Sequence, residues 1–155
     1  MAKESKTKVE LYTDGACSGN PGVGGWGAIL KFGEVEKELI GNEGHTTNNR
    51  MEMKAVIEGL KALKYPVYVE IYSDSAYIVN AINQNWLENW KKNGWRNAAK
   101  DPVSNQDLWQ ELDELMHIHT TKFFKVKGHA DHEYNNRADA LAVQAVQEYK
   151  NKHGL

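Results

Sequence analysis

Residues 8–40 read KVELYTDGACSGNPGVGGWGAILKFGEVEKELI and predict three consecutive antiparallel strands. Apolar and polar side chains alternate along Lys8–Asp14, which is typical of a half-buried strand, here ending in an aspartate. A turn-rich segment leads into a second strand over Gly25–Lys31, and the turn at Phe32-Gly33 leads into a third over Val35–Ile40. Because the connections are short, these strands are expected to form an antiparallel meander.

Helices and strands alternate after the meander. The expected elements are a helix that Thr46–Asn49 cap and Pro66 ends, a strand at 67–73, a short helix at 75–83, a helix capped by Ser104, a strand at 122–127, and a final helix whose apolar stripe runs from Ala138 to Tyr149. This order predicts an α/β protein with a five-stranded mixed sheet, an antiparallel meander plus parallel strands, flanked by helices.

Length and composition suit one intracellular domain. The 155 residues are enough for a single core, and the hydrophobic and charged fractions of 41% and 26% are ordinary. One cysteine, Cys17, excludes an internal disulfide and a cysteine-based zinc site. Because there is neither a membrane-length apolar run nor a signal peptide, we expect no membrane association and a cytoplasmic location. We expect one domain over 1–155, with flexible ends at 1–7 and 151–155.

The net charge of −2 argues against nucleic-acid binding, but the basic residues are clustered. Residues 84–101 form a basic segment with several tryptophans, and Thr120–Lys127 carries three lysines and no acid. A charge run is usually just a solvated face, but two basic segments containing aromatic residues favour a polyanionic partner.

Four acidic residues lie where strands end or helices begin. Asp14 and Asp74 end two strands that a mixed sheet would place side by side, and Glu52 and Asp139 each lie near the start of a helix. Taken singly, each has a structural explanation, as a turn residue or as part of a helix cap. If all four converge, two charges ~4 Å apart repel by about 4 kcal/mol at a dielectric of ~20, so protons or cations must neutralise them. Carboxylate oxygens without cysteine or paired histidine favour Mg²⁺ or Mn²⁺.

At this point the sequence resembles the bacterial type 1 ribonuclease H family over nearly its whole length. The matching segments are Tyr12-Thr13-Asp14-Gly15-Ala16 with Gly19-Asn20-Pro21-Gly22, Thr46-Thr47-Asn48-Asn49-Arg50-Met51-Glu52-Met53, Tyr72-Ser73-Asp74-Ser75, Val126-Lys127-Gly128-His129 and Asn136-Arg137-Ala138-Asp139. One such segment would be weak evidence, whereas five in order are specific.

The resemblance implies a ribonuclease H-like fold and a metal-dependent endoribonuclease that hydrolyses the RNA strand of RNA–DNA hybrids. It implies that Asp14, Glu52, Asp74 and Asp139 hold two Mg²⁺ ions when substrate is bound, with Mn²⁺ able to substitute. The products would carry 5′-phosphate and 3′-hydroxyl ends. His129 is implied to assist proton transfer or product release, which suits an imidazole. The protein is expected to act as a monomer.

The resemblance also implies where the hybrid binds. Its substrate-binding residues would be Gly15, Cys17, Asn20, Lys31, Thr47, Asn48, Asn49, Trp86, Lys91, Lys92, Arg96 and Lys100. Asparagine amides can both donate to and accept from a ribose 2′-hydroxyl, which distinguishes RNA from DNA. The cations of the basic protrusion, residues 84–101, would contact phosphates. Two positions depart from relatives: Ala76 stands where a glutamine is common, and Asp131 adds an acid near His129.

Three other functions deserve comparison. A non-catalytic hybrid-binding module on the same fold would tolerate loss of a carboxylate, and this chain retains all four. An actin-like phosphotransferase needs two lobes and a longer chain. A transposase or junction-resolving nuclease lacks the paired asparagines before Glu52 together with the Lys-Gly-His loop.

Overall fold

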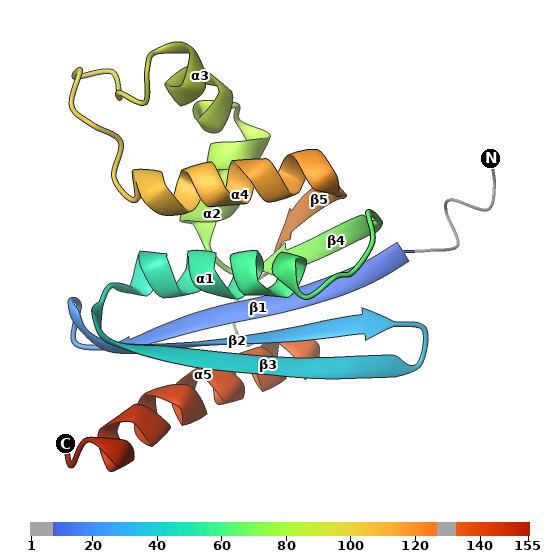
Figure 1. The fold of residues 1–155 in the computed structure, drawn as a ribbon, viewed down its shortest axis with the longest axis vertical. Helices are drawn as coiled ribbons and strands as arrows, with labels where there is room; N and C mark the ends of the chain where they lie inside the picture. The colour runs from blue at the N-terminus through green and yellow to red at the C-terminus, as the bar shows by residue number, and fades with distance from the viewer. Residues whose placement is uncertain (1–7, 127–132) are drawn as a thin grey trace.

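The computed structural model describes residues 8–126 and 133–155, and its strands form one mixed sheet. The strands are β1 (Lys8–Ser18), β2 (Gly22–Phe32), β3 (Val35–Thr46), β4 (Tyr68–Ser73) and β5 (Thr120–Lys125), in the spatial order β3-β2-β1-β4-β5 (Figure 1). β1, β2 and β3 pair antiparallel, whereas β4 pairs parallel with both β1 and β5. The predicted meander with added parallel strands is confirmed.

Helices cover both faces of the sheet. The helices are α1 (Asn48–Lys61), α2 (Ala76–Asn83), α3 (Trp86–Lys92), α4 (Gln106–Ile118) and α5 (Glu133–Lys152). α1 lies on β1 and β2 with α4 packed against it, and α5 covers β1, β2 and β3 from the opposite face (Figure 1). Within the described residues, no helix is long and apolar enough to cross a membrane.

The main hydrophobic core lies between α1 and the sheet. Leu11 of β1, Ile71 of β4, and Ile57 and Leu60 of α1 are fully buried there. The two residues from α1 are three positions apart and therefore share one face of the helix. This core holds α1 against β1, so the start of the helix lies beside the middle of the strand.

The first strand is longer than the sequence suggested. β1 continues past Asp14 to Ser18, so the prediction that the strand ends at Asp14 was wrong. Its pairing with β2 runs to the end of β1, but its pairing with β4 stops at Tyr12 opposite Tyr72. Asp14 therefore lies just beyond the point where β4 stops pairing with β1, which leaves room beside it for the residue that follows β4.

The helix caps agree with the expectation at α1 but not at α4. Ser104 does not cap α4, because Asn105 precedes the helix in the left-handed conformation with a φ of 60° and makes no side-chain cap bond. Asparagine adopts this conformation more readily than most residues. Thr47 caps α1 by accepting from the Arg50 amide at 3.3 Å, so Asn48 and Asn49 lie in the first turn.

The tryptophan-rich segment contains a helix that periodicity did not reveal. α3 spans only seven residues, and its Leu87 is buried in the core. Its Trp90 packs edge-on against Trp109 of α4, with ring centroids 5.5 Å apart. Such tertiary contacts stabilise a helix too short to be stable alone. At the other end of the chain, α5 continues to Lys152, two residues into the segment that we expected to be flexible.

Candidate active site

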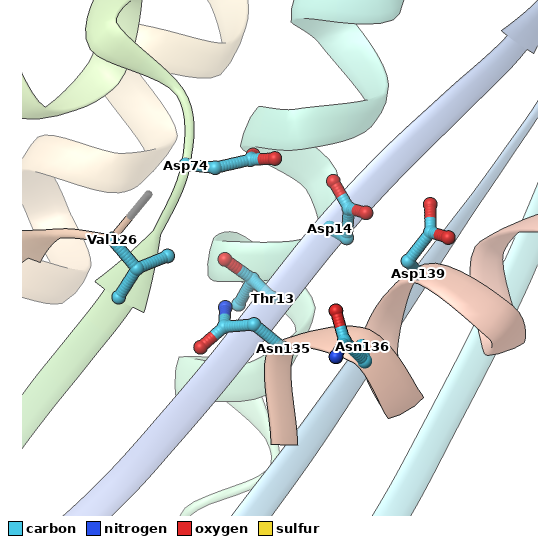
Figure 2. Close-up of a pocket in the computed structure, with 7 residues that line it drawn as sticks. All are labelled: Thr13, Asp14, Asp74, Val126, Asn135, Asn136 and Asp139. Carbon is cyan, nitrogen blue, oxygen red and sulfur yellow. The ribbon is translucent and has the colours of Figure 1, made fainter. Parts of the chain in front are cut away.

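Three of the four predicted carboxylates meet beside the middle of β1. Asp14, Glu52 and Asp74 each offer an oxygen, and these atoms all lie within 4.8 Å of one another. They come from three different elements, since Asp14 is in β1, Glu52 is in α1 and Asp74 follows β4. Figure 2 shows Asp74 reaching across the end of β4 toward Asp14.

Gly15 allows Glu52 to come this close to Asp14. A Cβ atom on Gly15 would lie 2.5 Å from the Glu52 amide nitrogen, nearer than real side chains approach a backbone. Any larger residue would push the first turn of α1 away from β1. The Gly15 amide itself donates to Asp14 Oδ1 at 2.9 Å, which fixes the carboxylate on the strand.

A second glycine brings Asp139 to the same place. Gly27 of β2 pairs with Asp14 in the sheet, and a Cβ atom there would lie 2.6 Å from the Ala138 carbonyl oxygen of α5. The next residue of the helix, Asp139, therefore reaches a position beside Asp14 (Figure 2). Both residues line one small pocket together with Thr13, Asp74, Val126, Asn135 and Asn136.

Burial and the close approach of these carboxyl groups raise the pKa values of two of them. Burial, the Asp74 charge and the Asp139 carboxyl together raise the pKa of Asp14 to about 8. Burial, followed by the charges of Asp14 and Asp74, also raises the pKa of Glu52 well above its usual value. Both shifts arise because a buried carboxylate beside other carboxylates is costly to ionise.

Buried oxygens in the cluster also lack hydrogen-bond partners. Glu52 Oε1 and Asp74 Oδ1 are buried and have no partner among the described residues. An unpaired buried acceptor is costly, about 1–3 kcal/mol, so such atoms in a folded protein call for a ligand. Hard divalent cations take carboxylate oxygens as ligands, and the residues present fit such an ion.

Some predicted substrate-binding residues lie near this cluster. Asn20 Oδ1 accepts from the Asn48 amide at 3.1 Å, so two of the three predicted asparagines are in contact. Cys17 Sγ lies 3.4 Å from the Thr46 carbonyl oxygen. Gly15, Thr47 and exposed Asn49 belong to the same region, because they flank the start of α1.

Lys31 lies apart from these residues, at the far end of β2. Its ammonium donates to the Gly33 carbonyl at 2.9 Å and lies 5.9 Å from the centre of the Tyr134 ring. Both contacts are local to the β2–β3 hairpin and the start of α5.

The basic protrusion is partly neutralised by its own neighbours. Lys91 Nζ lies 3.1 Å from Asp113 Oδ1 of α4 and 3.5 Å from Glu88 Oε2. Lys92 and Lys100 are exposed, as is Arg96, whose guanidinium donates to the Lys100 carbonyl at 3.0 Å.

Trp86, at the start of α3, is 37% exposed. Part of its side chain is therefore accessible to a binding partner.

His129 falls outside the described residues, as do Lys127, Gly128 and Asp131. Sequence reasoning gave no site role to four other residues that line the pocket, Thr13, Val126, Asn135 and Asn136. Thr13, Val126 and Asn136 were named only as members of the matching segments, and Asn135 lies just outside them. An asparagine in the first turn of a helix is common, so its type carried no signal.

Comparison with protein families decides the assignment of the chain. The family model described as RNase H matches residues 6–147. The chain belongs to the RNase H family. Curated relatives named ribonuclease H include one from Acetivibrio thermocellus, 59% identical over 145 residues, covering 94% of this chain and 99% of the relative. Another, from Chlorobaculum parvum, is 60% identical over 140 residues, covering 90% and 96%.

Solved RNase H structures share the fold. LC9-RNase H1, described as a type 1 RNase H with the type 2 active-site motif, is 31% identical, with a TM-score of 0.82 over 92% of this chain and 73% of that one. LC11-RNase H1 in complex with an RNA/DNA hybrid is 24% identical, with a TM-score of 0.71 over 91% of this chain and 98% of that one. The ribonuclease H-like fold expected from the sequence is thereby confirmed.

Proposed function

We propose that the protein is an endoribonuclease that hydrolyses the RNA strand of RNA–DNA hybrids. The observation that carries this proposal is the cluster of Asp14, Glu52 and Asp74, with Asp139 beside Asp14, in a member of the RNase H family. A non-catalytic binding module would have no need to keep these acids together, because their repulsion destabilises the fold. The RNA/DNA hybrid bound to LC11-RNase H1 supports the choice of substrate.

We propose that Asp14, Glu52, Asp74 and Asp139 hold two Mg²⁺ ions when substrate is bound, and that Mn²⁺ can replace them. Such ions would supply an activated water and stabilise the departing oxygen, leaving 5′-phosphate and 3′-hydroxyl ends. The protein's own part is to hold the four carboxylates close together, with Asp14 and Glu52 buried. The raised pKa values of Asp14 and Glu52 mean that they must release protons before they can bind a cation.

His129 is proposed to move a proton during the reaction or during product release, a role for which neutral and protonated imidazole are both accessible near pH 7. It precedes Asp139 by ten residues in the chain.

Recognition of the hybrid is proposed to divide between two regions. Asn20 and Asn48, which contact each other near the acidic cluster, would read the 2′-hydroxyls of the RNA strand together with Asn49. Exposed Lys92 and Lys100 on the basic protrusion would contact phosphates and set the position of the duplex. Because Lys91 is already paired with Asp113, it would contribute less to phosphate binding than its sequence position suggests.

We further propose that residues 1–155 act as one catalytic domain, as a monomer in the cytoplasm. A gel-filtration profile of the purified protein, with light scattering, tests the monomer directly.

The test of function is cleavage of end-labelled substrates with Mg²⁺ and with EDTA. The RNA–DNA hybrid should be cut only in its RNA strand and only with Mg²⁺, whereas duplex RNA and duplex DNA should remain intact. Asp14→Asn should lose at least ~10²-fold in kcat, because metal and water activation depend on this carboxylate. Glu148→Gln is the matched control, since it removes an exposed carboxylate from the other end of α5. Binding of the hybrid without cleavage under all conditions would favour the non-catalytic alternative.

A further inference from the structure

A buried amide links two of the backbone segments that carry the acidic cluster. Asn135 Nδ2 donates to the Tyr72 carbonyl oxygen of β4 at 3.2 Å, and Asn135 is 8% exposed. Asp139 follows four residues later on α5 and therefore lies on the same side of the helix, about one turn on. Asp74 follows Tyr72 by two residues. One hydrogen bond therefore connects the helix that carries Asp139 to the strand that leads to Asp74.

The hydrogen bond from Asn135 to Tyr72 lies where β4 stops pairing with β1. Tyr72 is the last residue of β4 that pairs with β1, and the chain beyond it reaches Asp74 without that support. The body of α5 packs on β1, β2 and β3, which sets its distance from Asp14, and its Tyr134 reaches β4 through Tyr12, whose ring stacks on both Tyr134 and Tyr72. Asn135 supplies a direct link across the remaining gap, and it lines the same pocket as Asp14, Asp74 and Asp139 (Figure 2).

The outer side of the same helical turn is fastened independently. The Arg137 guanidinium bonds Glu36 at 3.0 Å and Glu38 at 2.9 Å on β3, and the Tyr134 hydroxyl donates to Glu36 at 2.7 Å. These contacts hold the start of α5 on the sheet without help from Asn135. Loss of the Asn135 amide should therefore change the spacing between the helix and β4 rather than detach the helix.

We propose that Asn135 is a positioning residue for the metal site, because it holds Asp139 and Asp74 at the separation that bound ions require. This inference rests on the proposed function. Mutual repulsion among the carboxylates tends to spread their segments, and the Asn135 bond opposes that spreading. A neutral amide achieves this without placing a cation in the pocket that would compete with Mg²⁺. Because Mg²⁺ demands near-ideal octahedral geometry, even a small displacement of a ligand weakens binding.

The proposal is tested by Mn²⁺ affinity, measured by electron paramagnetic resonance of free Mn²⁺ in protein without substrate. Asn135→Ala and Asn135→Leu should each weaken binding by about tenfold, the usual effect of removing a group that orients a metal ligand. Asn135→Leu keeps the volume of the side chain but has no donor for Tyr72. The kcat on the hybrid should fall similarly, while KM for the hybrid changes less than twofold.

Asn42→Ala is the matched control. The Asn42 amide donates to the Ala145 carbonyl at 3.0 Å, so it also fastens α5 to the sheet, but more than a turn beyond Asp139. This variant should keep its Mn²⁺ affinity and kcat within twofold of wild type. Urea unfolding of all variants shows whether each one folds.

The outcomes separate this inference from the proposed function. If wild type binds Mn²⁺ and cleaves the hybrid but Asn135→Ala equals it in both, only the inference fails. Recovery of affinity in Asn135→Leu would assign Asn135 to packing alone, and equal losses in Asn42→Ala would indicate general loosening of α5; either result overturns the inference. If wild type neither binds Mn²⁺ nor cleaves, the proposed function fails and the inference fails with it.

Discussion

Replacing Asp14 with asparagine should abolish cleavage yet make the metal-free protein more stable near neutral pH. The folded protein raises the pKa of this carboxyl from 3.8 to about 8, through burial, the Asp74 charge and the Asp139 carboxyl. Between those two pH values the folded protein keeps a proton that the unfolded chain releases. The free energy of unfolding of wild type therefore falls as pH rises through this window. Asparagine has no proton to lose, so the variant escapes this loss.

The magnitude follows from the width of the window. From the ordinary pKa of Asp14 up to pH 7 is about three pH units, and each unit costs the folded wild type about 1.4 kcal/mol. The loss of stability that Asp14 causes at pH 7 is therefore at most ~4 kcal/mol. Part of this energy is repulsion shared with Glu52, whose own pKa the same burial and neighbouring charges raise well above its usual value. We therefore expect Asp14→Asn to gain about 2 kcal/mol at pH 7. The Gly15 amide keeps its bond, since an asparagine oxygen also accepts.

The measurement is urea unfolding in EDTA, followed by circular dichroism at pH 4, 6, 7 and 8. The difference in free energy of unfolding between Asp14→Asn and wild type should be small at pH 4, because this pH is close to the ordinary pKa of 3.8 and the unfolded chain has only begun to release its proton at residue 14. It should then grow steadily toward pH 8. Glu148→Gln, which removes an exposed carboxylate, should show a small difference that does not follow this curve.

Two results would refute this reasoning. If Asp14→Asn is less stable than wild type at pH 7, the carboxylate stabilises the fold through contacts that outweigh the repulsion. If the variant is more stable by the same amount at pH 4 and pH 8, the gain does not come from ionisation. In either case the acidic cluster would not be strained in the absence of cations, and the main physical support for a metal site would be lost.

Three further outcomes are expected. At 10 mM, Mg²⁺ should raise the Tm of wild type by several degrees in differential scanning calorimetry but leave Asp14→Asn unchanged, because a ligand specific to the native state stabilises it. Lys92→Ala should reduce the slope of log Kd against log salt for the hybrid by about one, whereas Lys91→Ala should change it less, since Lys91 is paired with Asp113; equal slopes would contradict this. Burial lowers the pKa of His119, whose Nδ1 accepts from the Val67 amide at 3.3 Å, so wild type should lose stability as pH falls below 6.5, by up to about 1 kcal/mol per pH unit. His119→Gln should flatten that decline in acid unfolding curves, and an unchanged curve would assign the decline to other groups.

The order and type of the elements were largely accessible from sequence because periodicity is a local signal. Alternation along β1 and the helical spacing in α1 each reflect one face packed against the core, so these elements were predicted correctly. Their limits were not. The glycines and small residues after Asp14 suggested a turn, but the close approach of α1 and the pairing with β2 keep the segment extended to Ser18. α3 depends on contacts with α4, which no window of its own sequence contains.

The candidate site could be predicted from the sequence to a similar degree. Placing Asp14 and Asp74 on neighbouring parallel strands was enough to predict that they meet, and their carboxylates do lie together with Glu52. The pairing of Lys91 with Asp113 was not predictable, because it depends on how α3 packs against α4. Asn135 was missed for the same reason, since its partner is a backbone carbonyl on β4. Residue type indicates what a side chain can do, but only the tertiary structure shows which partner it finds.

The same close approach of carboxylates that destabilises the metal-free protein prepares the acidic cluster to bind cations. Gly15 and Gly27 remove the side chains that would keep α1 and α5 away from β1, so backbone packing brings the carboxylates closer than their charges favour. The apolar core beneath α1 provides the energy that holds this arrangement without cations. A site held by packing is already formed when a cation arrives, so binding needs only the release of protons from Asp14 and Glu52. Metal affinity should therefore rise with pH up to about 8, over the same range in which the metal-free protein loses stability.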